Sequence, residues 1–129
     1  MFLVDAYAWV EYFIGSKKGE HAARVIDDPA VEVQTLESTL AEIRGWALRE
    51  GKDFEALHGV IKRNSDIIHT PLEEWLEAAN IRFEIRKRVP RFGMMDALLV
   101  ASKQAHGSKI LTGDPHFKGM ADVMYLGDK

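Results

Sequence analysis

The sequence contains no cysteine, which excludes disulfide bonds, thiolate metal sites and cysteine nucleophiles. It also has no excess of positive charge, because 17 lysines and arginines face 20 aspartates and glutamates and leave a net charge of -3. A protein that coats nucleic acid with a generally basic surface is therefore excluded, although a local basic patch is not.

Long apolar runs are missing as well. The opening stretch MFLVDAYAWVEYF reaches Asp5 and Glu11 too early for a signal peptide or a membrane span, so we expect a cytoplasmic protein with no membrane partner. No repeat, low-complexity tract or Pro/Gly-rich linker divides the 129 residues. The content of 47% hydrophobic and 29% charged residues is that of an ordinary globular protein, and residues 1–129 are expected to form one domain.

Short apolar stretches alternate with segments of helical periodicity along the chain. Strands are predicted at residues 2–4, 31–34, 66–69, 109–112 and 123–126. Helices are predicted at residues 6–14, 20–26, 36–51, 54–63, 70–83 and 93–107. This alternation predicts an α/β protein, in which a central, mostly parallel sheet of four to five short strands carries helices on both faces. Ligands bind such sheets at the carboxyl ends of the strands.

Four carboxylates stand out by their positions. Asp5 directly follows the first predicted strand, and Asp114 follows the fourth after a single glycine. Glu42 lies on the third predicted helix, and Asp96 lies in the first turn of the last one. Taken singly, each has an ordinary explanation, as an acid at a helix start, a turn residue or a half-exposed helix residue.

Asp96 is the hardest of the four to explain as purely structural. It is the only charge in GMMDALLVA, a segment that otherwise has the composition of buried chain, and no Lys or Arg lies within one turn of it. Carboxylates gathered at one end of a sheet would repel one another unless a divalent cation lay between them. Oxygen ligands favour Mg²⁺ or Mn²⁺ over zinc, and such ions commonly serve phosphoryl chemistry. The residues alone therefore indicate an acidic metal site and a phosphodiester substrate.

The segments around these acids resemble the motifs of PIN domains. FLVDAYAW is similar to the opening strand that carries the first active-site Asp of that family, and TLAEI to the helix that carries the second acid. DALLVA is similar to the helix headed by the third acid, and ILTGDPHF to the strand that leads to the fourth. The motifs follow the order of the family and span essentially the whole chain. By size and motif order, the chain is most similar to VapC-type toxins of prokaryotic toxin–antitoxin pairs.

The resemblance implies a PIN-like three-layer α/β/α fold and an endoribonuclease that depends on Mg²⁺ or Mn²⁺. Such toxins hydrolyse RNA phosphodiester bonds, are usually homodimers and are silenced by a small cognate antitoxin. The resemblance assigns the catalytic and metal-binding roles to Asp5, Glu42, Asp96 and Asp114, with Asp5 and Asp96 on the principal ion. The Thr112 hydroxyl is a candidate support, because it can hydrogen-bond a neighbouring carboxylate.

Two other functions remain open. One is a nuclease of the same fold that acts in RNA processing or cleaves DNA, and the other is a noncatalytic scaffold that binds RNA or protein. The presence of all four acids argues against the scaffold, because carboxylates that repel one another cost stability and an inactive protein would be free to lose them.

Three residues in two of the motifs depart from the family pattern. Ala6 and Tyr7 stand where many members have Ser or Thr shortly after the first Asp. His116 stands where some members have a further acid, which puts a second metal site in doubt. The sequence leaves open whether His116 binds phosphate, binds metal or is simply solvated.

The segment from Arg82 to Arg91 holds five cations against the single Glu84, a local charge of about +4. Because a guanidinium group donates two hydrogen bonds to one phosphate, we expect Arg86, Arg88 and Arg91 to bind the RNA backbone. The alternatives are a solvated helix end and a docking site for an acidic antitoxin tail.

Trp9 and Trp46 lie on the two predicted helices nearest the acids, and these helices are the first place where we expect an antitoxin groove. The alternative is that these aromatic residues belong to the core, which is where aromatic residues at helical spacing are usually found.

Overall fold

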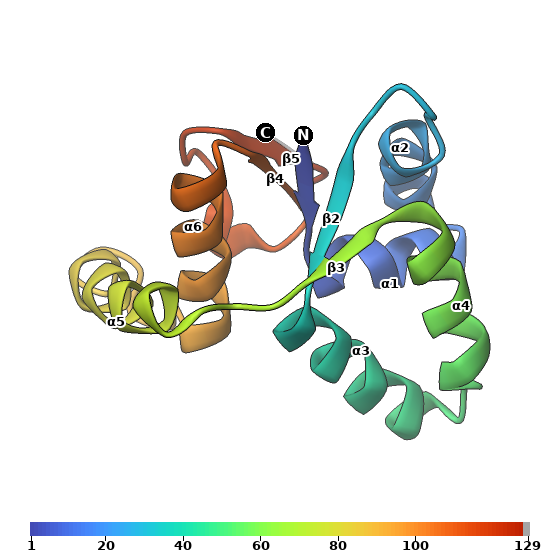
Figure 1. Cartoon of the computed structure of the whole chain (residues 1–129), viewed down its shortest axis with the longest axis horizontal. Coiled ribbons are helices and arrows are strands. Elements are labelled where there is room, and N and C mark those ends of the chain that lie inside the picture. The colour runs from blue at the N-terminus through green and yellow to red at the C-terminus, as the bar shows by residue number, and fades with distance from the viewer. Residues whose placement is uncertain (128–129) are drawn as a thin grey trace.

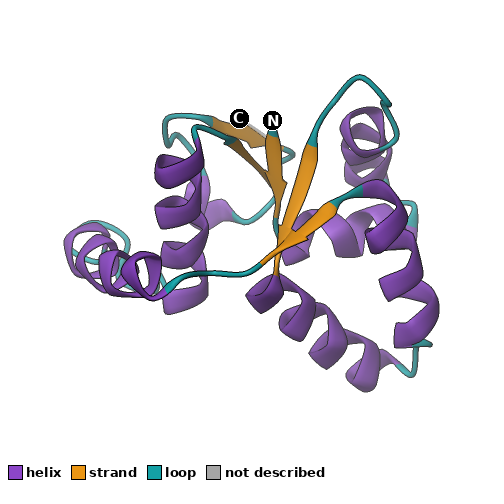
Figure 2. Ribbon diagram, in the orientation of Figure 1, coloured by secondary structure: helices purple, strands orange, loops and turns teal. Residues whose placement is uncertain are grey.

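The computed structural model describes residues 1–127, which form a parallel sheet with helices on both faces (Figures 1 and 2). This is the three-layer α/β/α arrangement that the resemblance to PIN domains implies. In chain order the elements are β1 (Phe2–Val4), α1 (Ala6–Ile14), α2 (Lys17–Ile26), β2 (Val33–Leu36), α3 (Glu37–Glu50), α4 (Phe54–Asn64), β3 (Asp66–Ile68), α5 (Leu72–Ile85), α6 (Met94–His106), β4 (Lys109–Thr112), the 3₁₀ turn η1 (Pro115–Phe117) and β5 (Val123–Tyr125).

Every predicted strand and helix is present, and the differences lie at the ends of elements. Helix α2 begins at Lys17 rather than at residue 20, because the hydroxyl of Ser16 accepts a hydrogen bond from the backbone N–H of Gly19 at 3.0 Å and caps the helix there. Apolar periodicity misses this first turn because Lys17, Lys18 and Gly19 include no apolar side chain that could mark a helix face. Strand β2 continues to Leu36, so α3 begins one residue later than predicted.

The five strands lie in the order β3-β2-β1-β4-β5, and every neighbouring pair is parallel. All carboxyl ends therefore lie along one edge of the sheet. The chain first builds outward from β1 to β3 and then returns to place β4 on the other side of β1. The strand order thus reverses between β1 and β4, which is where ligands bind in open parallel sheets. Asp5 and Asp114 follow these two strands.

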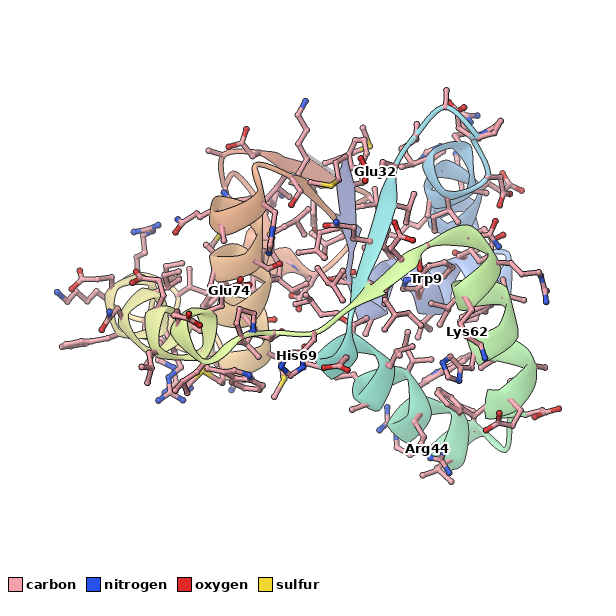
Figure 3. All side chains as sticks on the ribbon, viewed as in Figure 1. Trp9, Glu32, Arg44, Lys62, His69 and Glu74 are labelled. Atoms are coloured by element: carbon pink, nitrogen blue, oxygen red, sulfur yellow. The ribbon has the colours of Figure 1, made fainter. Side chains whose placement is uncertain are left out.

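Two apolar cores, one on each face of the sheet, hold the helices in place. Helices α1 to α4 cover one face, and α5 and α6 cover the other (Figure 1). Trp9 (Figure 3) lies in the core between the sheet and helices α1 to α4, where it is completely buried. Its indole Nε1–H donates to Thr35 Oγ1 at 3.1 Å. The expectation of a partner groove at Trp9 is therefore wrong, and its assignment to the core is confirmed.

Helices α1 and α2 approach closely at Gly19. A Cβ atom built at Gly19 would lie 1.9 Å from the backbone oxygen of Glu11, so only glycine permits this contact. The contact places the neighbouring Lys18 beside Tyr7 of α1, and the Lys18 ammonium donates to the Tyr7 hydroxyl at 3.1 Å. Within residues 1–127, no helix combines the length and the apolar character needed to cross a membrane.

Candidate active site

Asp5 is buried at the junction of β1 and α1 and caps the helix. Its Oδ1 accepts from the backbone N–H of Ala8 at 2.8 Å, and its Oδ2 accepts from the hydroxyl of Thr112. Burial, together with the smaller effect of the negative charges of Asp114 and Glu42, raises the pKa of Asp5 to about 7 despite these two hydrogen bonds. The carboxyl group is therefore held in a defined orientation, yet its charged form is poorly compensated.

Thr112 connects the acid of β1 with the acid that follows β4. Its hydroxyl group, completely buried, donates to Asp5 and accepts from the backbone N–H of Asp114 at 2.9 Å. Asp114 in turn caps η1, because its Oδ1 accepts from the backbone N–H of His116 at 2.9 Å. These bonds are the ones that a supporting role for Thr112 requires.

Asp96 lies in the first turn of α6, where its Oδ2 accepts from the backbone N–H of Gly93 at 3.0 Å. The expectation that its segment is wholly buried is wrong, because Met95 is exposed and the Asp96 side chain keeps 19% of its accessible surface. The continuously buried run begins only at Ala97, since the first turn of α6 lies at the edge of the sheet. The basic side chain that contacts Asp96 is that of His116, whose Nδ1 lies 3.1 Å from the Asp96 Oδ2.

Glu42 projects from α3 toward the other acids. The residue as a whole is exposed, but its carboxyl group is partly buried. This burial raises the pKa of Glu42 to about 7, with a smaller contribution from the negative charges of Asp96 and Asp114. Like charges on three different elements thus act on one another, as the sequence predicts for carboxylates gathered at the end of a sheet.

All four predicted acids line one cleft of about 320 Å³ at the carboxyl ends of β1 and β4. The lining also contains Ala6, Tyr7 and Trp46, which the sequence analysis considered. The lining residues that it did not single out are Val10, Glu11, Arg49 and Leu99. Glu42, Trp46 and Arg49 are spaced i, i+4 and i+7 on α3, so the helical period was the signal that could have placed Arg49 beside Glu42.

The tightest group of metal-ligating side chains among the described residues consists of Asp96, Asp114 and His116. One ligand atom from each of these residues lies within 4.8 Å of the other two. Asp5 and Glu42 line the same cleft without belonging to this group. The structure therefore pairs Asp96 most closely with Asp114, whereas the resemblance pairs it with Asp5.

The predicted RNA-binding arginines lie outside the acid cleft. Arg86 ends α5, and its Nε–H donates to the backbone oxygen of Phe92 at 2.7 Å, which ties the end of α5 to the segment before α6. Arg88 and Arg91 are exposed on the connection between these helices. Arg49 is instead the arginine that lines the cleft.

Comparison with solved structures finds the same fold in proteins of low sequence identity. A toxin–antitoxin complex from Klebsiella pneumoniae has a chain with a TM-score of 0.78 and 17% identity, and the match covers 100% of both chains. VapC20 from Mycobacterium tuberculosis, a Sarcin-Ricin loop cleaving toxin, has a TM-score of 0.75 and 18% identity over 95% of this chain and 97% of that one. VapBC2 from Rickettsia felis, bound to a promoter DNA fragment, has a TM-score of 0.69 and 13% identity over 96% of both chains.

Sequence comparison identifies a family for this chain but no curated relative. Curated protein sequences give no significant match to this chain. The family model of the PIN domain matches residues 2–123, which include all four acids and every strand of the sheet except the last two residues of β5. Since this match covers nearly the whole chain, the protein belongs to the PIN domain family.

Proposed function

We propose that this protein is an endoribonuclease that requires Mg²⁺ or Mn²⁺ and acts as the toxin of a VapBC-type toxin–antitoxin pair. The observation that carries the proposal is the cleft between β1 and β4, which four carboxylates line in a PIN domain. PIN domains are generally nucleases, and the similar structures include the toxins named above. A nuclease of RNA processing or of DNA remains the second candidate.

The side chains of the cleft fit a divalent cation. Asp96 and Asp114 offer carboxylate oxygens close enough to share one ion, and Asp5 and Glu42 line the same cleft. Burial and neighbouring acids raise the pKa values of Asp5 and Glu42, so a divalent cation in the cleft would stabilise the ionised forms that this site disfavours. When bound, such an ion supplies positive charge to the attacked phosphate and lowers the pKa of water.

The four acids have different parts in the proposed reaction, with two of them sharing one. Asp96 and Asp114 hold the ion, and Asp5 is kept in position beside them by Ala8 and Thr112. Glu42 is the group suited to accept a proton from the attacking water, because its pKa of about 7 matches neutral pH and its side chain is accessible from the cleft. Both metal ligation and proton transfer thus arise from the same edge of the sheet.

Metal removal tests the proposed activity. The purified protein is expected to cut a mixed, end-labelled RNA in Mg²⁺ or Mn²⁺ and to leave it intact in EDTA, since the carboxylates alone have no positive charge for the phosphate. Single- and double-stranded DNA of the same sequence serve as comparison substrates. Equal cleavage of DNA would favour the second candidate. Failure of the folded, metal-loaded protein to cut any of these substrates would favour a noncatalytic scaffold.

We propose that the RNA backbone passes over the exposed arginines before α6. Arg88 and Arg91 are free to bind phosphate, and Arg86 joins them through the nitrogens that do not contact Phe92. The double variant Arg88→Glu/Arg91→Glu is expected to weaken RNA binding and to reduce the slope of log affinity against log salt by about two. Fluorescence anisotropy measures both quantities, and Arg24→Glu/Arg63→Glu, which changes two exposed arginines on α2 and α4, is the control. An unchanged slope in Arg88→Glu/Arg91→Glu would refute this path.

We also propose a homodimer formed through α5. Leu72, Leu76 and Phe83 follow one face of this helix and are 70%, 62% and 61% exposed. The first half of α5 carries only acids among its charged residues, and Arg82 and the C-cap Arg86 lie near its end together with one acid, Glu84. An antiparallel pair would therefore bury the apolar face and bring the acids of one helix near the arginines of the other. Leu76→Glu is expected to halve the mass measured by light scattering, whereas Leu48→Glu, at the 74% exposed Leu48 of α3, is expected to leave it unchanged. A monomeric wild type would exclude this interface.

A small antitoxin is the proposed protein partner. Similar structures include toxin–antitoxin complexes, and a groove of about 540 Å³ shares Glu42 with the acid cleft. A protein segment in this groove, between α3 and the helices α5 and α6, would lie directly beside the acids. His69 lies at this groove near the start of α3 (Figure 3). The small protein encoded next to this gene is expected to bind and to stop RNA cleavage, and lack of binding would argue for a role in RNA processing instead.

A further inference from the structure

His116 extends the group of acids by one nitrogen ligand. It lies in η1, between β4 and β5, and its Nδ1 is 3.1 Å from the Asp96 Oδ2 and 3.7 Å from the Asp114 Oδ1. Its side chain retains 33% of its accessible surface, so the residue is neither core nor freely solvated. None of the roles assigned so far uses this imidazole.

The imidazole is held in place from two sides. The ring lies 6.3 Å from the ring of Phe92, and the next residue, Phe117, is completely buried and packs edge-on against the same phenylalanine at 5.5 Å. The backbone N–H of His116 donates to Asp114 at 2.9 Å. Because η1 is fixed at both ends, the ring is directed toward the two acids without a large loss of side-chain entropy on binding.

The distances from His116 Nδ1 to the two carboxylates are close to the spacing of ligands in one coordination sphere. Ligand atoms about 2.1 Å from a metal, at the angles of octahedral or tetrahedral geometry, lie roughly 3.0–3.4 Å from one another. The distances of 3.1 and 3.7 Å from the Nδ1 to the two carboxylates are close to this range. An ion between the three groups would therefore need only small side-chain movements.

We infer that His116 ligates the metal through Nδ1, and that this nitrogen makes the site prefer a first-row transition ion such as Mn²⁺ over Mg²⁺. Imidazole is a common ligand of transition metals, whereas Mg²⁺ selects oxygen ligands and retains water. The inference rests on the proposed metal-dependent function and adds to it the nature of the ion. In the competing explanation, His116 only donates a hydrogen bond that positions Asp96.

Binding of Mn²⁺ alone tests this inference without any activity measurement. Electron spin echo modulation of the Mn²⁺-loaded wild type is expected to show coupling to an imidazole ¹⁴N, and His116→Asp is expected to bind Mn²⁺ without this coupling. Titrations with MnCl₂ and MgCl₂ by calorimetry give the ratio of the two dissociation constants. The dissociation constant for Mg²⁺ divided by that for Mn²⁺ is expected to be above one in the wild type. It is expected to fall about tenfold or more in His116→Asp, whose site offers only oxygen ligands.

The control variant is His21→Asp, at an exposed histidine of α2, and it is expected to retain both the nitrogen signal and the metal ratio. A second variant, His116→Asn, guards against a folding defect and is expected to lose the signal as well. Tight Mn²⁺ binding and RNA cleavage by a wild type that shows no nitrogen coupling would overturn only the role of His116. A wild type that binds neither ion and cuts no RNA would overturn the proposed function together with it.

Discussion

The variant Asp96→Asn is expected to cut RNA about 10³-fold more slowly than the wild type at saturating Mg²⁺ or Mn²⁺. Asparagine has the shape of aspartate and can still accept the hydrogen bond from the Gly93 N–H, so α6 retains its first turn. What it removes is the negative charge beside Asp114 and His116. A loss of several kcal/mol of metal-based stabilisation of the attacked phosphate corresponds to this factor in rate.

Single-turnover cleavage rates and urea unfolding of the metal-free protein check this prediction together. Asp96→Asn is expected to be at least as stable as the wild type without metal, because it removes one of several charges that repel one another. Asp66→Asn is the matched control, since Asp66 is exposed at the amino end of β3, whereas the acids lie at the carboxyl ends of the strands. Cleavage by Asp96→Asn within tenfold of the wild type would contradict the metal-binding role.

The metal-free protein is expected to become less stable as the pH rises from 5.5 to 8. Burial raises the pKa of Asp5 to about 7 in the folded protein, against 3.8 for the ordinary group. A raised carboxyl pKa means that the folded state binds the proton more tightly, so this contribution is fully present below about pH 4 and is lost as the pH rises through 7. Over the stated interval, Asp5 alone accounts for about 2 kcal/mol of lost unfolding free energy.

Glu42 changes the stability in the same direction, because its pKa is also raised to about 7. Urea unfolding at both pH values measures the effect, and Asp5→Asn is expected to flatten the dependence because asparagine does not titrate. Saturating Mg²⁺ or Mn²⁺ is expected to stabilise the wild type more at pH 8 than at pH 5.5, since the ion competes with protons for the carboxylates. The unfolding free energy of the metal-free wild type could instead rise between these pH values, relative to that of Asp5→Asn. Such a rise would show that burial does not raise the pKa of Asp5.

Local patterns were sufficient to predict the elements of this fold. Apolar runs such as Phe2–Val4 and the helical spacing in α3 and α6 depend on neighbours a few residues apart, which the sequence displays directly. Where the prediction erred, at the start of α2, a hydrogen bond from Gly19 to Ser16 decided the boundary in the absence of any apolar signal. Caps of this kind are local, but they are weaker signals than periodicity.

Contacts between distant elements were beyond such patterns. The hydrogen bond from Thr112 to Asp5 joins two residues that lie 107 positions apart in the sequence. The burial of Trp9 depends on Thr35 of β2, which lies 26 residues away in the sequence. Neither spacing nor composition encodes these contacts, because they follow from the order of the strands and from the faces on which the helices pack.

The sequence by itself determined that four acids would meet, since residues that follow parallel strands, or lie on the helices after them, gather at one edge of the sheet. Only the tertiary structure decided how they meet. The reversal of strand order between β1 and β4 joins Asp5 to Asp114 through Thr112, and the packing of Phe117 on Phe92 brings His116 to Asp96. The physical reason is that local propensity selects helix or strand, whereas burial of two apolar cores selects which side chains become neighbours.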